Sequence, residues 1–336
     1  MKVALLGNGW IGNNAHRRSF DSLKEEGSSI ELVATCDVRG ETESKCKGER
    51  FYTDFDELLK NEKELDMVLI CLPTFLHAEY AIKAMEAGLH VLCEKPMALT
   101  VEDCEKMIAC SKKTGKRLMV AHCCRFTDER RIMKKFIEDG SFGKPVSAFF
   151  CAADGTPEWG WENWFADRNR SGGCMLDLQA HNIDLVNWFF GVPEFVSVVG
   201  RECNKEFEGY GSVSANSCYN DGLFIHNWSD WGILFNKHNK RYIRINFEKG
   251  YVYQDMNENK ELVAVSYEDK SVTNLLTERK ITVSDYRAEL EYFVECVENN
   301  LPFDICPPEE SANVIKVMLA QEKSADAHGA PVKPLA

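Results

Sequence analysis

Three short segments of the sequence carry residues whose types and spacing suit chemistry. They are Gly7-Asn8-Gly9-Trp10-Ile11-Gly12, Glu94-Lys95-Pro96, and a run from Gly172 to Asp184 that contains Asp177 and His181. Glycines at the first spacing let backbone approach a phosphate, and a histidine beside a carboxylate titrates near neutral pH and can take a proton from an alcohol. These residue types indicate dinucleotide binding and proton transfer at a hydroxyl group.

The glycine-rich segment is a GxGxxG pattern that follows an apolar run and opens a helical pattern. Gly7 permits a tight turn, Gly9 lets backbone approach a pyrophosphate, and Gly12 lets the helix pack closely against the strand. A helix that opens near Trp10 and Ile11 also offers free N–H groups to an anion. We therefore expect these five residues to contact a cofactor; the alternative is a turn with a structural role alone.

A carboxylate at the end of the second apolar run bears on which cofactor is used. Asp37 stands 25 residues after Gly12, where an acid can accept hydrogen bonds from the adenosine ribose and repel a 2′-phosphate. This position favours NAD over NADP. Arg39 leaves NADP open, because a nearby arginine can pair with the phosphate.

The second segment places a lysine at the end of a predicted strand. Ligands bind at the carboxyl ends of strands in an open α/β sheet, so Lys95 is placed to face a nicotinamide ring. Pro96 restricts Lys95 to an extended backbone and stiffens the turn. The alternative is a lysine that is simply solvated.

The third segment places two titratable groups on one helical face. Asp177 and His181 are four residues apart, and Asp184 follows three residues later. A carboxylate one turn from an imidazole can fix its tautomer, and the imidazole then suits a general base for an alcohol. The alternative is a satisfied Asp–His pair in the core.

The elements that must position these residues follow from hydrophobic periodicity. In the first third, short apolar runs alternate with amphipathic ones, which predicts β-α-β units and a parallel sheet. The predicted strands are Lys2–Leu6, Glu31–Cys36, Met67–Leu72, His90–Cys93 and Arg117–Ala121. The predicted helices are Phe75–Ala87 and Val101–Thr114, which stop at Gly88 and Gly115, with Thr100 as a capping residue of the second.

The pattern changes after Ala121, so we expect domains at residues 1–121 and 122–336, the second of α+β class. Its predicted elements are helices at 128–139, 174–190, 285–299 and 309–326, a strand at 146–150, and mostly strands from 196 to 272. The alternating run Arg241–Phe247 followed by Glu248-Lys249-Gly250 indicates a hairpin, hence antiparallel sheet.

Composition excludes several classes of protein. The formal net charge is −13, which disfavours nucleic acid and anionic lipid as partners. No apolar run reaches the length of a membrane span, and we expect a cytoplasmic protein. The 14 cysteines include no CxxC pair and no zinc spacing, so we expect reduced thiols and no metal; Cys123-Cys124 leaves a redox role open.

These motifs occur in one order, and the chain resembles the glucose-fructose oxidoreductase / inositol dehydrogenase / rhizopine-catabolism (Gfo/Idh/MocA) family. The shared pieces are Gly7-x-Gly9-x-x-Gly12, Leu72-Pro73-Thr74 with His77, Glu94-Lys95-Pro96, Gly172-Gly173-x-x-x-Asp177-x-x-x-His181 and Ser324-Ala325. The resemblance covers nearly the whole chain and is thin across residues 195–280. It implies an N-terminal Rossmann domain with a doubly wound parallel sheet that holds NAD(P), and a C-terminal domain with a large, mostly antiparallel sheet that often builds a homodimer or homotetramer.

The resemblance also implies roles for named residues. Lys95, Asp177 and His181 fall on the family's catalytic positions, and the Lys95-Pro96 peptide is expected to be cis. Further implied cofactor contacts are Leu72, Pro73, His77 and Glu94, and candidate substrate contacts are Arg125, Trp164 and Asn182. The aromatic loop Trp159–Phe165 fits a substrate-pocket wall or core packing equally well.

The implied activity is hydride transfer between a nicotinamide cofactor and a secondary hydroxyl or ketone of a sugar, sugar derivative or cyclitol. Two alternatives stay open. Some relatives use bound NAD for transient oxidation during glycosidic bond cleavage without net redox change, and others bind dinucleotide as non-catalytic regulators. The substrate, the physiological direction and the choice between dimer and tetramer are left open by the sequence.

Overall fold

The computed structural model describes residues 1–203, 206–232, 239–258, 261–276 and 284–335. Contacts divide the chain into two units, which are described separately. The first unit comprises residues 1–126, 159–164 and 283–312, and the second comprises 127–158, 165–282 and 313–336. The expected domain division between residues 121 and 122 stays a prediction, while the contacts group two later segments with the N-terminal one.

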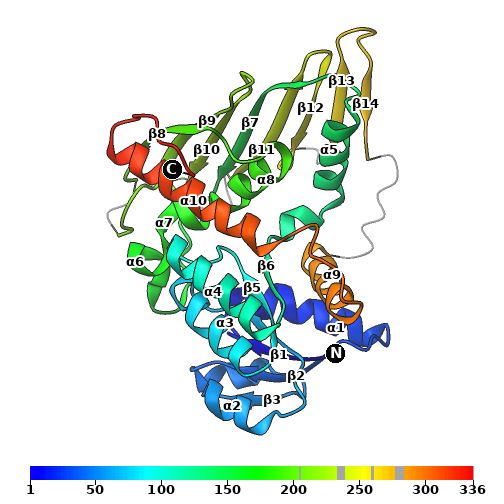
Figure 1. The fold of residues 1–336 in the computed structure, drawn as a ribbon, viewed down its shortest axis with the longest axis vertical. Helices are drawn as coiled ribbons and strands as arrows, with labels where there is room; N and C mark the ends of the chain where they lie inside the picture. Colours follow the sequence, from blue (N-terminus) through cyan, green and yellow to red (C-terminus); the bar gives the residue numbers. More distant parts are fainter. Residues whose placement is uncertain (204–205, 233–238, 259–260, 277–283, 336) are drawn as a thin grey trace. The chain divides into compact units, whose positions relative to one another are not determined.

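The first unit contains a six-stranded parallel sheet in the order β3-β2-β1-β4-β5-β6 (Figure 1). Its strands are β1 (Lys2–Leu6), β2 (Glu31–Cys36), β3 (Arg50–Tyr52), β4 (Met67–Ile70), β5 (His90–Glu94) and β6 (Leu118–Ala121). The central strands are continuous apolar runs because helices cover both faces of a parallel sheet, and Val3 and Leu69 are fully buried. This strand order confirms the expected Rossmann topology, with its switch point between β1 and β4.

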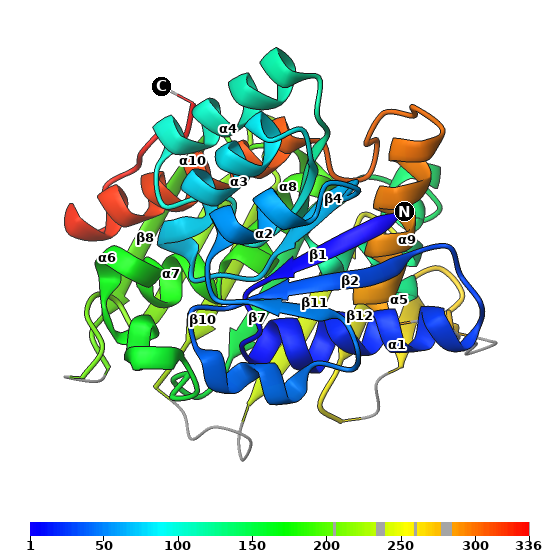
Figure 2. The same cartoon turned by 90° about the horizontal axis from the view of Figure 1, so that it is seen from below.

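Helices cover the two faces of this sheet. Figure 2 shows α3 (His77–Glu86) and α4 (Val101–Thr114) on one face and α1 (Arg17–Glu25) on the other. The helix α9 (Asp285–Glu298) contacts α1 and β6, and Leu290 and Phe293 join the apolar core of the sheet. A segment nearly 300 residues along the chain thereby completes the first unit.

Local sequence signals predicted how helix α4 of the first unit begins and ends. Thr100 Oγ1 accepts a hydrogen bond from the Asp103 N–H at 3.1 Å and caps α4, and Gly115 ends that helix in the left-handed conformation at φ 68°. The Lys95-Pro96 peptide is cis, as the family resemblance implies. The strand β3 and the helix α2 (Phe55–Asn61) were not predicted, since β3 has three residues and α2 seven.

The second unit contains an eight-stranded sheet in the order β14-β13-β12-β11-β7-β10-β9-β8. Its strands are β7 (Pro145–Ala153), β8 (Phe195–Arg201), β9 (Ser212–Cys218), β10 (Phe224–Asp230), β11 (Lys240–Phe247), β12 (Gly250–Asp255), β13 (Leu262–Ser266) and β14 (Val272–Asn274). Among the described residues only β7 and β10 pair in parallel; every other pairing is antiparallel. The large, mostly antiparallel sheet is confirmed, and Phe247 pairs with Gly250 in the expected hairpin.

Alternation along these strands gives the sheet two different faces. In β11 the side chains of Ile243, Ile245 and Phe247 are buried, whereas Tyr242 and Arg244 are half-buried. The helix α8 (Ala180–Phe190) packs against β7 on the sheet. The remaining helices are α5 (Asp128–Asp139), α6 (Arg168–Ser171), α7 (Gly173–Asp177) and α10 (Pro308–Asp326).

The single helix predicted over residues 174–190 is wrong, because α7 and α8 are separated at Leu178 and Gln179. Both residues nevertheless keep right-handed helical dihedral angles, and the Leu178 and Gln179 N–H groups both donate to the Cys174 carbonyl. The spacing of one turn between Asp177 and His181 is therefore retained. No helix in the described ranges is long and apolar enough to span a membrane.

Candidate functional site

The glycine-rich turn adopts the geometry that a dinucleotide requires. Gly7 has φ +97°, and a Cβ there would lie 2.5 Å from the Cys71 carbonyl oxygen. A Cβ on Gly12 would lie 2.2 Å from the Gly7 carbonyl oxygen, so helix and strand approach too closely for a side chain. A Cβ on Gly9 would meet only the Arg39 guanidinium, at 3.5 Å. Gly9 thus presents open space beside a helix N-terminus, which suits a pyrophosphate.

Asp37 lies at the end of β2 beside this turn and is almost fully buried. Its Oδ1 accepts from the Arg39 N–H at 3.0 Å and Arg39 Nε at 2.8 Å, and its Oδ2 accepts from the Asn8 N–H at 2.8 Å and Arg39 Nη2 at 2.7 Å. Burial disfavours ionisation of this carboxyl, yet the hydrogen bonds from Arg39 and Asn8 outweigh it and lower the pKa of Asp37. A carboxylate offers about four acceptor positions, so Arg39 must release Asp37 before ribose hydroxyls can bind there.

Two tryptophans of the aromatic loop also contact this part of the first unit. The rings of Trp10 and Trp159 lie 5.2 Å apart, and the Arg39 guanidinium lies 5.5 Å from the centre of the Trp161 ring. Trp10, Trp159 and Trp161 are each 40% exposed or more. These contacts put two tryptophans beside the expected cofactor residues, whereas Phe165 at the end of the loop is buried against Trp231 in the second unit.

Lys95 follows β5 directly and is half-buried. The preceding Glu94 is buried; its Oε2 accepts from the Lys95 backbone N–H at 3.1 Å, and its Oε1 lies 2.7 Å from His16 Nε2. The Lys95 peptide is therefore tied to a buried acid at the carboxyl end of the sheet, where ligands bind in this architecture.

The His77 side chain contacts the backbone of the loop that contains Lys95. Its Nδ1 lies 2.8 Å from the Pro96 carbonyl oxygen and its Nε2 lies 2.9 Å from the Leu72 carbonyl oxygen, and the ring is buried. Both partners are carbonyl oxygens, which only accept hydrogen bonds, so the ring forms both bonds only when it carries two protons. Burial acts against that state, because it lowers the pKa of His77. His77 thus links the ends of β4 and β5 as a buried bridge, and Leu72 and Pro73 are half-buried beside it.

The second unit holds the Asp177–His181 pair. Gly172 and Gly173 have φ +75° and +69°, and a Cβ on Gly172 would lie 2.4 Å from the Leu176 Cβ, so the chain enters α7 through a turn that only glycine fits. From Ser171 to Val186 every residue is buried except Asp177 and His181, which are half-exposed. One turn of an otherwise buried helical segment therefore leaves a carboxylate and an imidazole partly accessible.

The three candidate substrate residues have different surroundings. Arg125 is fully buried in the first unit, where its Nη1 donates to the Ile305 carbonyl and pairs with Glu310. Asn182 is buried in the second unit and its Nδ2 donates to Asn227 Oδ1 at 2.8 Å. Trp164 is half-buried. The substrate role of each stays a prediction, and for Arg125 and Asn182 these bonds supply a structural role as well.

All 14 cysteines are free thiols. Cys123 is buried and Cys124 half-buried; the hydrogen bond from its neighbour and burial both raise the pKa of Cys123 well above its usual value. Because the thiolate is the reactive form, Cys123 lacks the activation that redox-active cysteines need.

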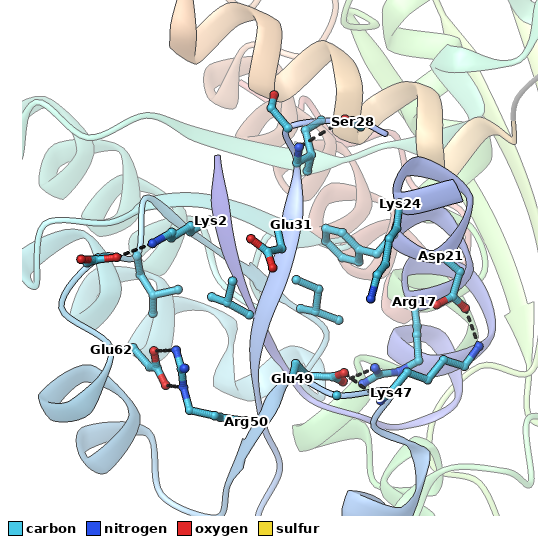
Figure 3. A pocket seen from close by; sticks show the side chains of 18 of the residues that line it. Lys2, Arg17, Asp21, Lys24, Ser28, Glu31, Lys47, Glu49, Arg50 and Glu62 are labelled. Carbon is cyan, nitrogen blue, oxygen red and sulfur yellow. Dashed lines mark hydrogen bonds and ion pairs between the residues drawn. The ribbon is translucent and has the colours of Figure 1, made fainter. Parts of the chain in front are cut away.

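A surface pocket of about 1030 Å³ lies elsewhere on the first unit (Figure 3). Lys2, Glu31 and Arg50, at the amino ends of β1, β2 and β3, contribute to its lining together with α1. Ligands of open α/β sheets bind at the opposite ends of the strands. Its wall also contains the ion pairs Arg17–Glu49, Lys47–Asp21, Arg50–Glu62 and Lys2–Glu64, so we assign it no part in the reaction.

Sequence reasoning missed His16 and Glu289, which lie close to the residues above, and it named Trp161 only as part of the aromatic loop 159–165. His16 stands four residues after Gly12, on the turn that the glycine pattern had already identified. Glu289 stands next to Leu290 on the buried face of α9, and an acid at a core position is a usable signal. Trp161 gave no such signal, because its contact with Arg39 joins residues far apart in sequence.

Comparisons with known proteins agree with this architecture. A model described as the oxidoreductase family with an NAD-binding Rossmann fold matches residues 1–122, and a model of the GFO/IDH/MocA C-terminal domain matches residues 131–253. Levoglucosan dehydrogenase, solved with NADH and levoglucosan, superposes with a TM-score of 0.88 at 19% identity over 100% of both chains. Aldose-aldose oxidoreductase from Caulobacter crescentus superposes with a TM-score of 0.86 at 22% identity over 99% of both chains.

Similar sequences carry related names. A 2,7-anhydro-N-acetylneuraminate hydratase of Mediterraneibacter gnavus is 31% identical over 268 residues, 75% of this chain and 67% of the relative. A myo-inositol 2-dehydrogenase of Thermotoga maritima is 32% identical over 196 residues, 57% of this chain and 55% of that protein. The first model covers the glycine-rich turn and Lys95, and the second covers Asp177 and His181. The chain therefore belongs to the Gfo/Idh/MocA family of oxidoreductases, whose N-terminal Rossmann fold binds NAD.

Proposed function

We propose that this protein is an NAD-dependent dehydrogenase or reductase that acts on a secondary hydroxyl or ketone of a sugar, sugar derivative or cyclitol. The observation that carries the proposal is the exposure of Asp177 and His181 on a helical segment that is otherwise buried. A satisfied core pair would be enclosed on all sides. The names of the relatives, which include inositol and glucoside dehydrogenases, support the substrate class.

In this proposal each site residue would have a separate binding or catalytic role. Gly7, Gly9 and the first turn of the helix hold the pyrophosphate, and Asp37 holds the ribose. When bound, the nicotinamide ring accepts or supplies the hydride. His181 takes the proton of the substrate hydroxyl during oxidation, and Asp177 orients the imidazole and stabilises its charged form. Lys95 donates a hydrogen bond to the same substrate oxygen and stabilises negative charge that develops on it.

Steady-state absorbance of reduced nicotinamide across a panel of polyols, sugars and cyclitols tests the reaction. Lys95→Met and His181→Asn are each expected to lower kcat by about 10²- to 10⁴-fold, because each removes one proton-handling or charge-stabilising group. Lys113→Met, an exposed lysine on α4, is the matched control and should leave kcat unchanged. No turnover of any compound by a wild-type protein that binds NAD contradicts the proposal.

A reaction without net redox change is the second candidate. It is favoured by the hydratase relatives, since hydration by itself changes no oxidation state. The same residues would then serve a transient oxidation during cleavage of a glycosidic or anhydro bond. Cofactor that stays bound through purification, with sugar product and no net reduced nicotinamide, would identify this reaction. A purely regulatory dinucleotide sensor is disfavoured, because it has no need of Lys95, Asp177 and His181.

The proposal includes a homodimer or homotetramer formed through the less covered face of the eight-stranded sheet. Half-buried aromatic side chains follow one another across that face: Phe149 stacks on His226 and contacts Tyr242, which contacts Tyr253. Aromatic residues are enriched in protein interfaces. Light scattering on the purified protein tests this; a monomer at micromolar concentration contradicts it. All 14 cysteines lie in the described ranges and none forms a disulfide, which supports the cytoplasm as its location.

A further inference from the structure

The first unit contains a buried cluster of three titratable side chains immediately behind the Lys95 loop. His16 is the last residue of the π-helical turn η1 (Gly12–His16), Glu94 ends β5, and Glu289 lies on α9. Their exposed fractions are 0%, 6% and 0%. One nitrogen or oxygen atom from each lies within 4.8 Å of the other two. Three elements far apart in sequence thus bring an imidazole and two carboxyl groups together in the core.

Hydrogen bonds satisfy only part of this cluster. Glu94 is engaged on both oxygens, by His16 Nε2 at 2.7 Å and by the Lys95 N–H at 3.1 Å. His16 Nδ1 and both oxygens of Glu289 are fully buried and have no hydrogen-bond partner among the described residues. Buried polar groups are almost always hydrogen-bonded. We therefore expect at least one carboxyl group of this cluster to carry a proton, so that Glu289 can form a hydrogen bond with His16 or Glu94.

Two charged carboxylates at this distance in the core would repel each other strongly. Among the described residues, the ionisable groups that interact with Glu289 include no cation apart from His16. They are Glu94 from β5, Asp285 and Tyr286 from α9 itself, Cys123 and Cys124 from η4 (Cys123–Phe126), and Cys71 after β4. The neighbouring cations Arg287 and Arg125 are bonded to Glu26 and Glu310 instead. Burial and the charges of Glu94, Asp285 and Cys124 all raise the pKa of Glu289.

We propose that Glu289 is a positioning residue that is held as a neutral carboxylic acid at neutral pH and donates its proton as a hydrogen bond to the His16–Glu94 pair. The neutral acid leaves one negative charge in the cluster, on Glu94, and fixes the carboxylate that holds the Lys95 peptide. This inference rests on the proposed catalytic role of Lys95. Glu289 acts through Glu94 and has no contact with the reacting atoms.

A metal ion in place of this proton does not fit the geometry. His16 Nε2 and Glu94 Oε1 lie 2.7 Å apart, which is a hydrogen-bond distance. Two ligand atoms on a tetrahedral zinc ion lie about 3.3 Å apart, given metal–ligand distances of about 2.0–2.1 Å. The pair would have to separate before an ion could bind both.

Infrared spectroscopy of the wild-type protein without substrate tests the protonation state directly. We expect a carbonyl band of a protonated carboxyl group near neutral pH, which Glu289→Gln abolishes. Glu295→Gln, an exposed acid on the same helix, is the matched control and should keep the band. Absence of the band from the wild-type protein at neutral pH overturns the proposal, and this readout is independent of whether any polyol is turned over.

Stability and kinetics provide the second arm. A raised pKa in the folded state means that the wild-type protein loses stability as pH rises toward that pKa, so Glu289→Gln, which has no such group, should gain stability relative to wild type at alkaline pH. If Glu289 ionises at alkaline pH, wild-type kcat should fall there; Glu289→Gln should keep kcat near neutral pH and show no such fall. Glu289→Leu should lower kcat about 10²-fold with the NAD Kd unchanged, because it displaces Lys95. The proposal is overturned if Glu289→Gln and Glu289→Leu have the same kcat and the same pH profile. It is also overturned if added zinc stabilises the wild-type protein but neither variant.

Discussion

The three glycines of the turn allow a paired experiment that separates folding from cofactor binding. A Cβ on Gly12 would lie 2.2 Å from a backbone carbonyl oxygen, far below any tolerated contact, and only movement of the helix could relieve it. A Cβ on Gly9 would make one ordinary contact at 3.5 Å with the end of the Arg39 side chain, and Gly9 has no positive φ. The same substitution is therefore expected to have opposite consequences at positions three residues apart.

The expected magnitudes follow from these distances. Gly12→Ala should lower the free energy of unfolding by about 1–3 kcal/mol, the usual cost of overpacking. Gly9→Ala should change it by less than about 1 kcal/mol, because alanine at a compatible position only restricts the unfolded chain. Its methyl group would occupy the open space beside the helix N-terminus. Loss of one charge-assisted hydrogen bond to the pyrophosphate costs about 1.5–3 kcal/mol, which corresponds to roughly a 10- to 150-fold increase in the NAD Kd.

Urea unfolding and titration of NAD by calorimetry measure the two effects on the same preparations. Gly40→Ala, where a Cβ would meet nothing within 4 Å, controls for the substitution itself. If Gly9→Ala binds NAD as wild type does while its stability is also unchanged, the pyrophosphate does not approach Gly9. The assignment of this turn to the cofactor would then be refuted, whatever the effect of Gly12→Ala.

Three further variants, one of them a double substitution, follow from the site. If Lys95 and His181 act on the same proton-transfer step, the double variant Lys95→Met/His181→Asn should lower kcat by no more than the larger of the two single substitutions. Single-turnover kinetics measure this step. Arg39→Ala should favour NAD over NADP by about 10-fold or more in Kd, because the guanidinium is the group placed to pair with a 2′-phosphate; an unchanged ratio contradicts this. Arg125→Met should lower the free energy of unfolding by about 1–3 kcal/mol in urea titrations, since the Ile305 carbonyl loses its hydrogen-bond donor while Glu310 can be solvated; wild-type stability with a raised KM would instead favour a substrate contact.

Much of the first unit could be predicted because its signals are local. The bounds of β1, β2 and α4 agree with the sequence pattern, since each is bordered by a capping residue, a glycine or a turn. The φ of +97° at Gly7 and the close approach at Gly12 likewise follow from a motif six residues long. Short elements escaped prediction because a strand of three residues, Arg50–Tyr52, is shorter than the window in which periodicity can be recognised.

The parts that escaped prediction depend on contacts between distant residues. Nothing in the sequence around Trp161 indicates that it lies against Arg39, or that α9 completes the core of the parallel sheet. The hydrogen bonds to Asp37 also escaped prediction, although Arg39 is only two residues away, because they depend on the directions of two side chains and on the distant Asn8 N–H. The motif identifies an acid at the ribose position, but four hydrogen bonds to that acid appear only when the chain is folded. The sequence alone therefore leaves NADP open.

The helix that carries His181 shows why burial, rather than residue type, separates a site from a core. The sequence offers three titratable residues there at helical spacing, Asp177, His181 and Asp184, and either a core pair or a catalytic pair fits that pattern. In the structure Asp184 is fully buried, while Asp177 and His181 are half-exposed. The partial exposure of two of these three groups is what the catalytic interpretation predicts. Asp184 supplies the comparison within the same segment: it shows how an acid with a structural role is placed, and Asp177 is placed differently.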